Sequence, residues 1–162
     1  MRRYIRRRAW FGFWAGLAFL LTALAAYAQA KDSIIGTWVL DRAKSEFTPD
    51  NPNLFSRTMI FEPIDNGFNC IIRTESTRRD MSETKYTARY DGKDAPIDVS
   101  VLDTVSLRRI DANTIERTGK IRGKAVETAT MKVSADGKTL TLTTKGSFDG
   151  ENYNSTQVFD RK

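Results

Sequence analysis

The sequence contains no histidine and a single cysteine among its 162 residues. Without histidine, the chain lacks the commonest general base, the usual zinc ligand and any Ser-His or Cys-His pair. Cys70 alone can form neither a thiolate cluster nor an internal disulfide, so stability must come from core burial. No phosphate-binding loop, dinucleotide fingerprint or calcium loop occurs. We therefore expect a protein that is not an enzyme and holds no metal or cofactor.

Positive charge is concentrated at the start of the chain. The net charge is +6, but five of the 26 basic residues precede residue 9, and no acid precedes Asp32. Residues 31–162 therefore carry 21 basic and 20 acidic side chains. This balance gives no reason to expect nucleic acid as a partner.

The arginines are followed by an apolar run, residues 9–27, and then by Ala28-Gln29-Ala30. These are the three parts of a secretory signal, so we expect a signal helix in residues 1–30 that is cleaved after Ala30. Residues 31–162 would then form one periplasmic or secreted domain that is not embedded in a membrane. An uncleaved anchor is the alternative, because about 19 apolar residues nearly span a bilayer. The positive-inside rule places the domain outside the cytoplasm in both cases.

Residues 31–162 consist of short alternating segments separated by turn signals, and no window repeats apolar side chains at helical spacing. The pattern predicts ten antiparallel strands, over residues 33–41, 56–63, 68–76, 81–90, 93–98, 104–110, 114–121, 125–134, 138–146 and 152–161. Residues 42–53 are expected to be irregular.

Asx-Gly dipeptides between these segments predict two-residue hairpin loops, which fix the strand register. Asp136-Gly137 and Asp149-Gly150 predict that Leu140 pairs with Val133 and with Phe159. Asp91-Gly92 predicts pairs of Ala88 with Ala95 and Tyr86 with Ile97, and Asn66-Gly67 predicts pairs of Phe61 with Ile72 and Pro63 with Cys70. Three-residue loops at 111–113 and 122–124 predict pairs of Leu107 with Arg117 and Ile121 with Ala125. All six turns place apolar residues on one face, and a sheet this wide must then fold over itself or close. The pattern leaves a sandwich and a barrel open.

Two short segments at the ends of the domain resemble a known superfamily. Gly36-Thr37-Trp38 opens the first strand, and Val158–Lys162 closes the last. This pattern resembles the calycins, that is, the lipocalins and fatty-acid-binding proteins. Residues 34–47 and 103–116 are similar to secreted lipocalin-like bacterial proteins. The resemblance implies an all-β, up-and-down, closed antiparallel barrel of eight to ten strands. It also implies that Gly36, Trp38 and Arg161 meet where the barrel closes. Residues 42–53 leave no room for the two helices that cap fatty-acid-binding proteins.

The inward face is apolar near the Asp136-Gly137 turn and polar near the Asp149-Gly150 turn. An apolar base beneath a polar upper half suits a barrel that holds one small ligand. The candidate ligand-binding residues are Arg117, Glu127, Tyr86, Thr74, Thr144, Tyr153, Ser155 and Gln157. Arg117 either holds an anionic head group, as inward arginines do in fatty-acid-binding proteins, or forms a structural ion pair with Glu127.

Two functions follow from this interpretation. The first is an exported lipocalin-like protein that binds a small amphipathic or hydrophobic molecule inside the barrel. The second is a barrel filled by its own side chains, which acts through its surface as an interaction or structural module of the cell envelope.

Overall fold

The computed structural model describes residues 32–162, in which there are ten strands and no helix. The expected signal segment lies outside these residues. The strands are β1 (Gly36–Thr48), β2 (Leu54–Ile64), β3 (Gly67–Ser76), β4 (Met81–Arg89), β5 (Ala95–Pro96), β6 (Thr104–Arg109), β7 (Thr114–Ile121), β8 (Lys124–Val133), β9 (Thr139–Phe148) and β10 (Glu151–Arg161). No helix in this part of the chain has the length and apolar character needed to cross a bilayer.

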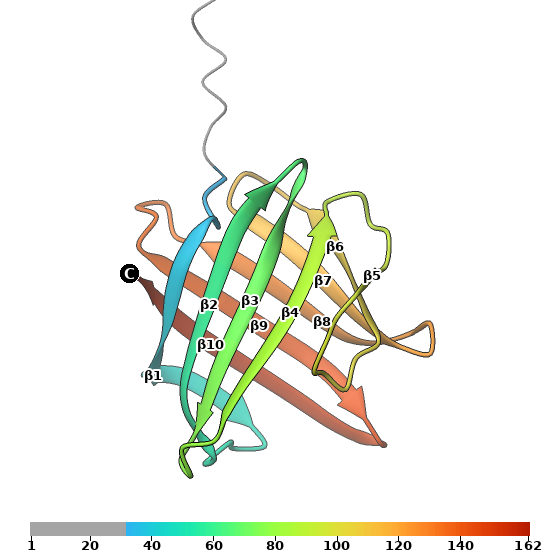
Figure 1. Ribbon diagram of the computed structural model, residues 1–162. Helices are drawn as coiled ribbons and strands as arrows, with labels where there is room; N and C mark the ends of the chain where they lie inside the picture. The colour runs from blue at the N-terminus through green and yellow to red at the C-terminus, as the bar shows by residue number, and fades with distance from the viewer. Residues whose placement is uncertain (1–31) are drawn as a thin grey trace, which may run out of the picture. The chain divides into compact units, whose positions relative to one another are not determined.

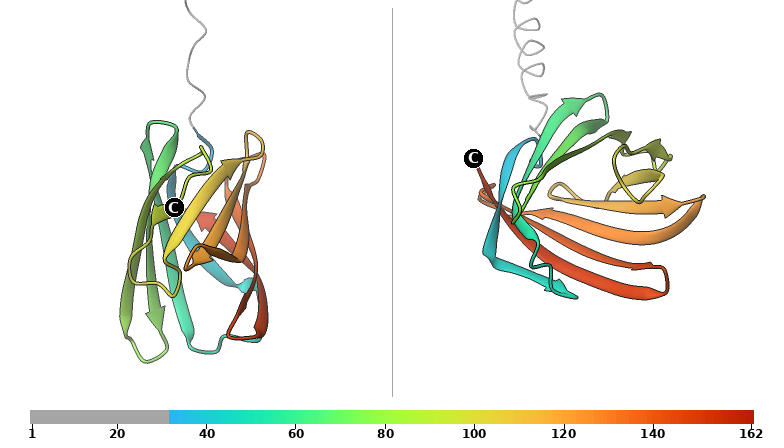
Figure 2. Two further views of the ribbon diagram at one scale, coloured as in Figure 1. Left: turned by 90° about the vertical axis from the view of Figure 1, so that its right-hand side faces the viewer. Right: turned by 60° about the horizontal axis from the view of Figure 1, so that its bottom comes forward.

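The strands form one antiparallel sheet in the order β4-β3-β2-β1-β10-β9-β8-β7-β6-β5. Neighbours in the sheet are therefore neighbours in sequence, except that β1 pairs with β10 (Figure 1). Such a sheet coils into a nearly closed barrel, which is seen along its open end in the right-hand view of Figure 2. The all-β prediction and the barrel, rather than the sandwich, are confirmed.

The register predicted from the last two turns is correct. Leu140 pairs with Val133 on β8 and with Phe159 on β10, and Leu107 pairs with Arg117 across β6 and β7. The loop between β7 and β8 is one residue shorter than predicted, because Ile121 pairs with Lys124. A bulge between Gly119 and Lys120 absorbs the difference.

The predicted register of β2 and β3 is wrong by two residues. Phe61 pairs with Cys70 rather than with Ile72, and Pro63 pairs with Phe68 rather than with Cys70. The turn is therefore Asp65-Asn66, with Asn66 at a φ of 51°. Gly67 is already in the strand, and a Cβ there would meet the carbonyl oxygen of Ala88 at 2.2 Å. This glycine permits close packing of β3 against β4 instead of forming the turn.

The barrel closes least completely between β4 and β6. The predicted strand 93–98 is reduced to Ala95–Pro96, which pairs with β6, because Pro96 has no N–H to donate to a ladder. The predicted pair of Tyr86 with Ile97 exists as an isolated bridge, while the predicted partner of Ala88, Ala95, lies opposite Val105. The backbone N–H of Asp98 also donates to the carbonyl of Lys85 at 3.0 Å.

β1 continues beyond its predicted end at Asp41 to Thr48. Its pairing with β10 is interrupted between Asp41 and Glu46 and then resumes. Ser45 stabilises the interruption: its hydroxyl donates to the Asp41 carbonyl at 2.7 Å and accepts from the Val158 N–H at 3.0 Å. Part of the segment expected to be irregular is therefore strand.

The core fills the end of the barrel near residues 32–35. Trp38, Phe61, Phe68 and Phe159 are fully buried there. The Trp38 indole donates to the Ile34 carbonyl at 2.8 Å. This chain segment thereby seals one end of the barrel and leaves the other available for a cavity.

The guanidinium of Arg161 covers the indole of Trp38, with 4.1 Å between its central carbon and the ring centroid. It also donates to the carbonyls of Ser33 and Ile35, at 2.6 and 2.9 Å. Gly36 has a φ of 141°, and a Cβ on it would lie 2.6 Å from Arg161 Nη1. Glycine is required at this position because β1 and the arginine approach so closely. The three residues of the sequence motif therefore lie together.

Candidate ligand-binding cavity

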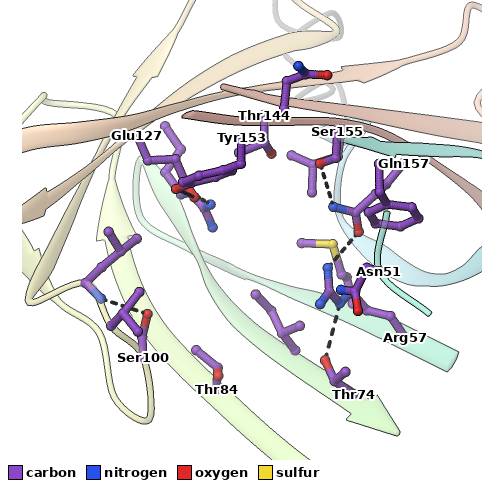
Figure 3. A pocket seen from close by; sticks show the side chains of 18 of the residues that line it. Asn51, Arg57, Thr74, Thr84, Ser100, Glu127, Thr144, Tyr153, Ser155 and Gln157 are labelled. Atoms are coloured by element: carbon purple, nitrogen blue, oxygen red, sulfur yellow. Dashed lines mark hydrogen bonds and ion pairs between the residues drawn. The ribbon is translucent and has the colours of Figure 1, made fainter. Parts of the chain in front are cut away.

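A cavity of about 450 Å³ occupies the other half of the barrel (Figure 3). Its deep wall is apolar and is formed by Met59, Ile72 and Leu142, and the segment 97–102 covers one side. Most of the remaining lining is polar. The polar residues are Thr48, Asp50, Asn51, Arg57, Thr74, Thr84, Ser100, Arg117, Glu127, Thr144, Tyr153, Asn154, Ser155 and Gln157.

Seven of the eight candidate binding residues line this cavity. Those seven are Arg117, Glu127, Thr74, Thr144, Tyr153, Ser155 and Gln157. Tyr86 does not line it, because its side chain is buried in the core opposite Cys70. The side chains that the sequence predicted to point inward from β3 and from β7 to β10 therefore line one cavity.

Arg117 and Glu127 form an ion pair inside the barrel, with side chains only 10% and 11% exposed. They lie diagonally on β7 and β8, because Arg117 pairs with Ala129 and Glu127 with Gly119. Guanidinium Nη2 donates to Glu127 Oε1, and the Tyr153 hydroxyl donates to Glu127 Oε2 at 2.8 Å. Both carboxylate oxygens are thus already engaged. The predicted contact between Arg117 and Glu127 is therefore present.

The surroundings of Arg117 favour its charged form. Burial opposes the charge on Arg117, but the Tyr86 hydroxyl and the Glu127 carboxylate more than offset it, and the pKa of Arg117 lies above its ordinary value. Burial, followed by the bond to Glu127, raises the pKa of Tyr153. Tyr153 therefore remains a neutral donor to the carboxylate at physiological pH.

Arg57 is the functional candidate that the sequence interpretation missed. It lies on β2 and reaches across the cavity: Nη1 donates to Gln157 Oε1 at 2.7 Å, and Nε donates to Thr74 Oγ1 at 3.3 Å (Figure 3). Both acceptors are neutral, and within residues 32–162 no carboxylate lies within ion-pair distance of this guanidinium. The signal was present, because Arg57 alternates with the inward residues Met59 and Phe61.

Burial is the main reason that the pKa of Arg57 is lowered from its ordinary value, and the nearby positive charge of Arg117 adds to it. Glu127 opposes this shift. The interior of the cavity thus contains two guanidinium groups and one carboxylate, which is already paired, while the Asp50 carboxylate lies at the exposed rim beside Arg42. The excess positive charge is at Arg57.

Two buried polar atoms beside the cavity have no hydrogen-bond partner within the described part of the chain: the Tyr86 hydroxyl and Arg117 Nε. The centre of the Arg117 guanidinium lies 6.0 Å from the Tyr86 ring centroid. Below them, burial raises the pKa of the Cys70 thiol to about 12, so this cysteine is an inert core residue. No group of three histidine, cysteine or acidic side chains suited to a metal ion occurs in residues 32–162.

Solved structures with this fold include the zebrafish ileal bile acid-binding protein in complex with cholic acid. That protein has a TM-score of 0.51 and 10% sequence identity, over 80% of this chain and 99% of its own. At this identity the likeness shows the fold alone, which is the calycin-type barrel that the sequence resemblance implied.

Two more distant structures also match. The siderocalin Ex-FABP has a TM-score of 0.44 and 8% identity, over 80% of this chain and 74% of its own. The protein mFAP2b bound to DFHBI has a TM-score of 0.42 and 10% identity, over 80% of this chain and 94% of its own. No protein-family model and no curated protein sequence matches the chain.

Proposed function

We propose that residues 31–162 form an exported binding protein that holds one small amphipathic molecule in the barrel, with an anionic group of the ligand next to Arg57. The observation that carries this proposal is the cavity of about 450 Å³, which contains a half-buried cation without a carboxylate partner. Its volume falls within the range of about 300–1,000 Å³ typical of small-molecule sites.

The structural neighbours support binding rather than catalysis. The zebrafish protein is named for bile acid binding and its structure contains cholic acid. An amphipathic acid of that kind would suit a cavity with an apolar deep wall and a polar upper part. The alternative function expected from the sequence requires a barrel that is filled by its own side chains. Such a barrel would not contain a cavity of about 450 Å³.

Arg57, rather than Arg117, is the residue that we propose for the anionic group. Arg117 already has a carboxylate partner, whereas Arg57 is held only by an amide and a hydroxyl oxygen. A ligand carboxylate would supply the charge-assisted hydrogen bonds that these neutral acceptors do not.

Export is proposed from the sequence features of residues 1–30. Protein isolated from the envelope or medium of its own host should begin at Lys31, as measured by intact mass. A full-length chain that retains residues 1–30 would contradict cleavage and favour the anchor.

Ligand binding is tested by filling the cavity. Thr144→Phe places a ring among the lining residues, and Thr143→Phe places the same ring on the outer face of β9. Native mass spectrometry of host-purified protein should show a bound molecule in the wild type and in Thr143→Phe, but not in Thr144→Phe. Ser155→Phe replaces Thr144→Phe if circular dichroism shows that the latter does not fold. An empty wild-type barrel that also binds no fatty-acid probe would refute the proposed function.

A further inference from the structure

The polar groups of the cavity surround it on most sides. Gln157 and Ser155 come from β10, Thr144 from β9, Glu127 from β8 and Thr74 from β3 (Figure 3). Small-molecule sites are usually lined mostly by apolar side chains, with a few polar groups that orient the ligand. In this cavity polar residues outnumber apolar ones along the wall, and polar and apolar atoms expose similar areas to it.

Many of these groups retain unused hydrogen-bonding capacity. A guanidinium has five N–H donors, and Arg57 uses Nε and Nη1 for Thr74 and Gln157. Its Nη2 takes part in neither of these two hydrogen bonds, and Arg117 Nε, buried beside the cavity, has no hydrogen-bond partner within residues 32–162. These groups are available to a molecule in the cavity.

An extended acyl chain would fit this lining poorly. It would displace water from hydroxyl, amide and guanidinium groups and return no hydrogen bonds, and burying such groups unpaired is costly. A ligand with its own hydroxyl groups would replace the water contacts instead. The excess positive charge at Arg57 calls for an acidic group on the same molecule.

We propose that the ligand class is a hydroxylated organic acid, such as a sugar acid, rather than a long-chain fatty acid. This inference rests on the proposed function and narrows it. The acid group binds at Arg57 beside Gln157, and the ligand hydroxyls pair with the polar wall formed by β3, β9 and β10. The apolar deep wall of Met59, Ile72 and Leu142 contacts the carbon skeleton.

Four probes, measured by isothermal titration calorimetry, separate the contribution of the carboxylate to binding from that of the hydroxyl groups. Gluconate carries both a carboxylate and hydroxyls, hexanoate has the same chain length with the carboxylate alone, sorbitol has the hydroxyls alone, and palmitate is the long-chain acid. We expect gluconate to bind at least about tenfold more tightly than the other three probes, because unmatched polar groups in a polar site discriminate strongly. Arg57→Gln should abolish the preference for gluconate over sorbitol, whereas Arg73→Gln, on the outer face of β3, should leave it unchanged.

The outcomes distinguish this inference from the proposed function. If palmitate binds tightly and gluconate binds no better than hexanoate, the ligand is not a hydroxylated acid. The proposed function as a small-molecule binding protein would still hold. An unchanged preference in Arg57→Gln would overturn the assignment of the acid group to that residue. If no probe binds and the host-purified barrel is empty, the proposed function itself fails. Chemical identification of a co-purified ligand should show an acidic group and several hydroxyls.

Discussion

The buried pair of Arg117 and Glu127 can be tested by removing one charge. Glu127→Gln preserves the shape of the side chain and one carbonyl oxygen, but it leaves the Arg117 guanidinium buried without a carboxylate. Arg117 is only 8% exposed, so water cannot fully replace the lost partner. Breaking a buried pair from one side costs roughly 3–5 kcal/mol. Because the amide oxygen of glutamine still accepts a hydrogen bond, we expect a loss of about 3 kcal/mol, at the lower end of that range.

Removing both charges should be far less harmful. In Arg117→Met/Glu127→Leu neither side chain is left as an uncompensated ion, and apolar replacements of buried pairs are often neutral or stabilising. We expect the free energy of unfolding of the double variant to lie within about 1 kcal/mol of the wild-type value. The matched control is Glu116→Gln, which breaks the exposed pair with Arg108 across the neighbouring strands β6 and β7 and should cost less than about 1 kcal/mol.

The assay is equilibrium unfolding in urea at pH 7, followed by the fluorescence of Trp38. This is the only tryptophan of residues 31–162, and it is buried beneath Arg161. An electrostatic role for the buried pair would be refuted if Glu127→Gln were no more destabilising than Glu116→Gln. It would also be refuted if the double variant were as unstable as the single one, because the side chains would then contribute through packing rather than charge.

Three further predictions concern the sealed end of the barrel and the core. Arg161→Met should lower the free energy of unfolding by more than about 1 kcal/mol, because the contact with Trp38 is lost. The variant should also shift the fluorescence emission of Trp38, and an unchanged spectrum would contradict the contact. Gly36→Ala should also cost more than about 1 kcal/mol in urea unfolding, because its φ and the nearness of Arg161 both disfavour a Cβ. The raised pKa of Cys70 means that the thiol contributes full stability below pH 9.0 and loses it as pH rises toward about 12. The decline should be shallower in Cys70→Ala, and equal slopes would refute this assignment.

The sequence predicted the strands well where turn chemistry and alternation agreed. Leu140 has the predicted partners on both sides because the Asp-Gly loops that flank β9 are short and each admits one register. Gly67 misled the prediction, since its role is set by the backbone of Ala88, which is distant in sequence. The end of β1 was missed for a related reason: its bulge depends on a hydrogen bond between Ser45 and Val158.

The sequence could predict which side chains of the site point into the barrel, but not which of them contact one another. Alternation alone placed Arg117 and Glu127 inside the barrel and within reach of one another, because the two residues lie on one hairpin. The contact between Arg57 and Gln157 joins strands β2 and β10, which become close only when the barrel coils. Local patterns carry no information about which inward residues meet across the interior.

We expect Arg57 to contribute to ligand binding without adding to the stability of the fold. A half-buried guanidinium held by neutral acceptors gains less than one paired with a carboxylate, and within the described residues no carboxylate forms an ion pair with Arg57.

Arg57→Met should therefore leave the free energy of unfolding unchanged or raise it by about 1 kcal/mol, because Thr74 and Gln157 can be hydrated from the cavity. Arg117→Met, which strands Glu127, should lower it by about 3 kcal/mol in the same urea assay. If both arginine variants were equally destabilised, Arg57 would be a structural residue. If Arg57→Met were stable but no longer bound the ligand, the cation would be retained for recognition, since the fold alone does not require it.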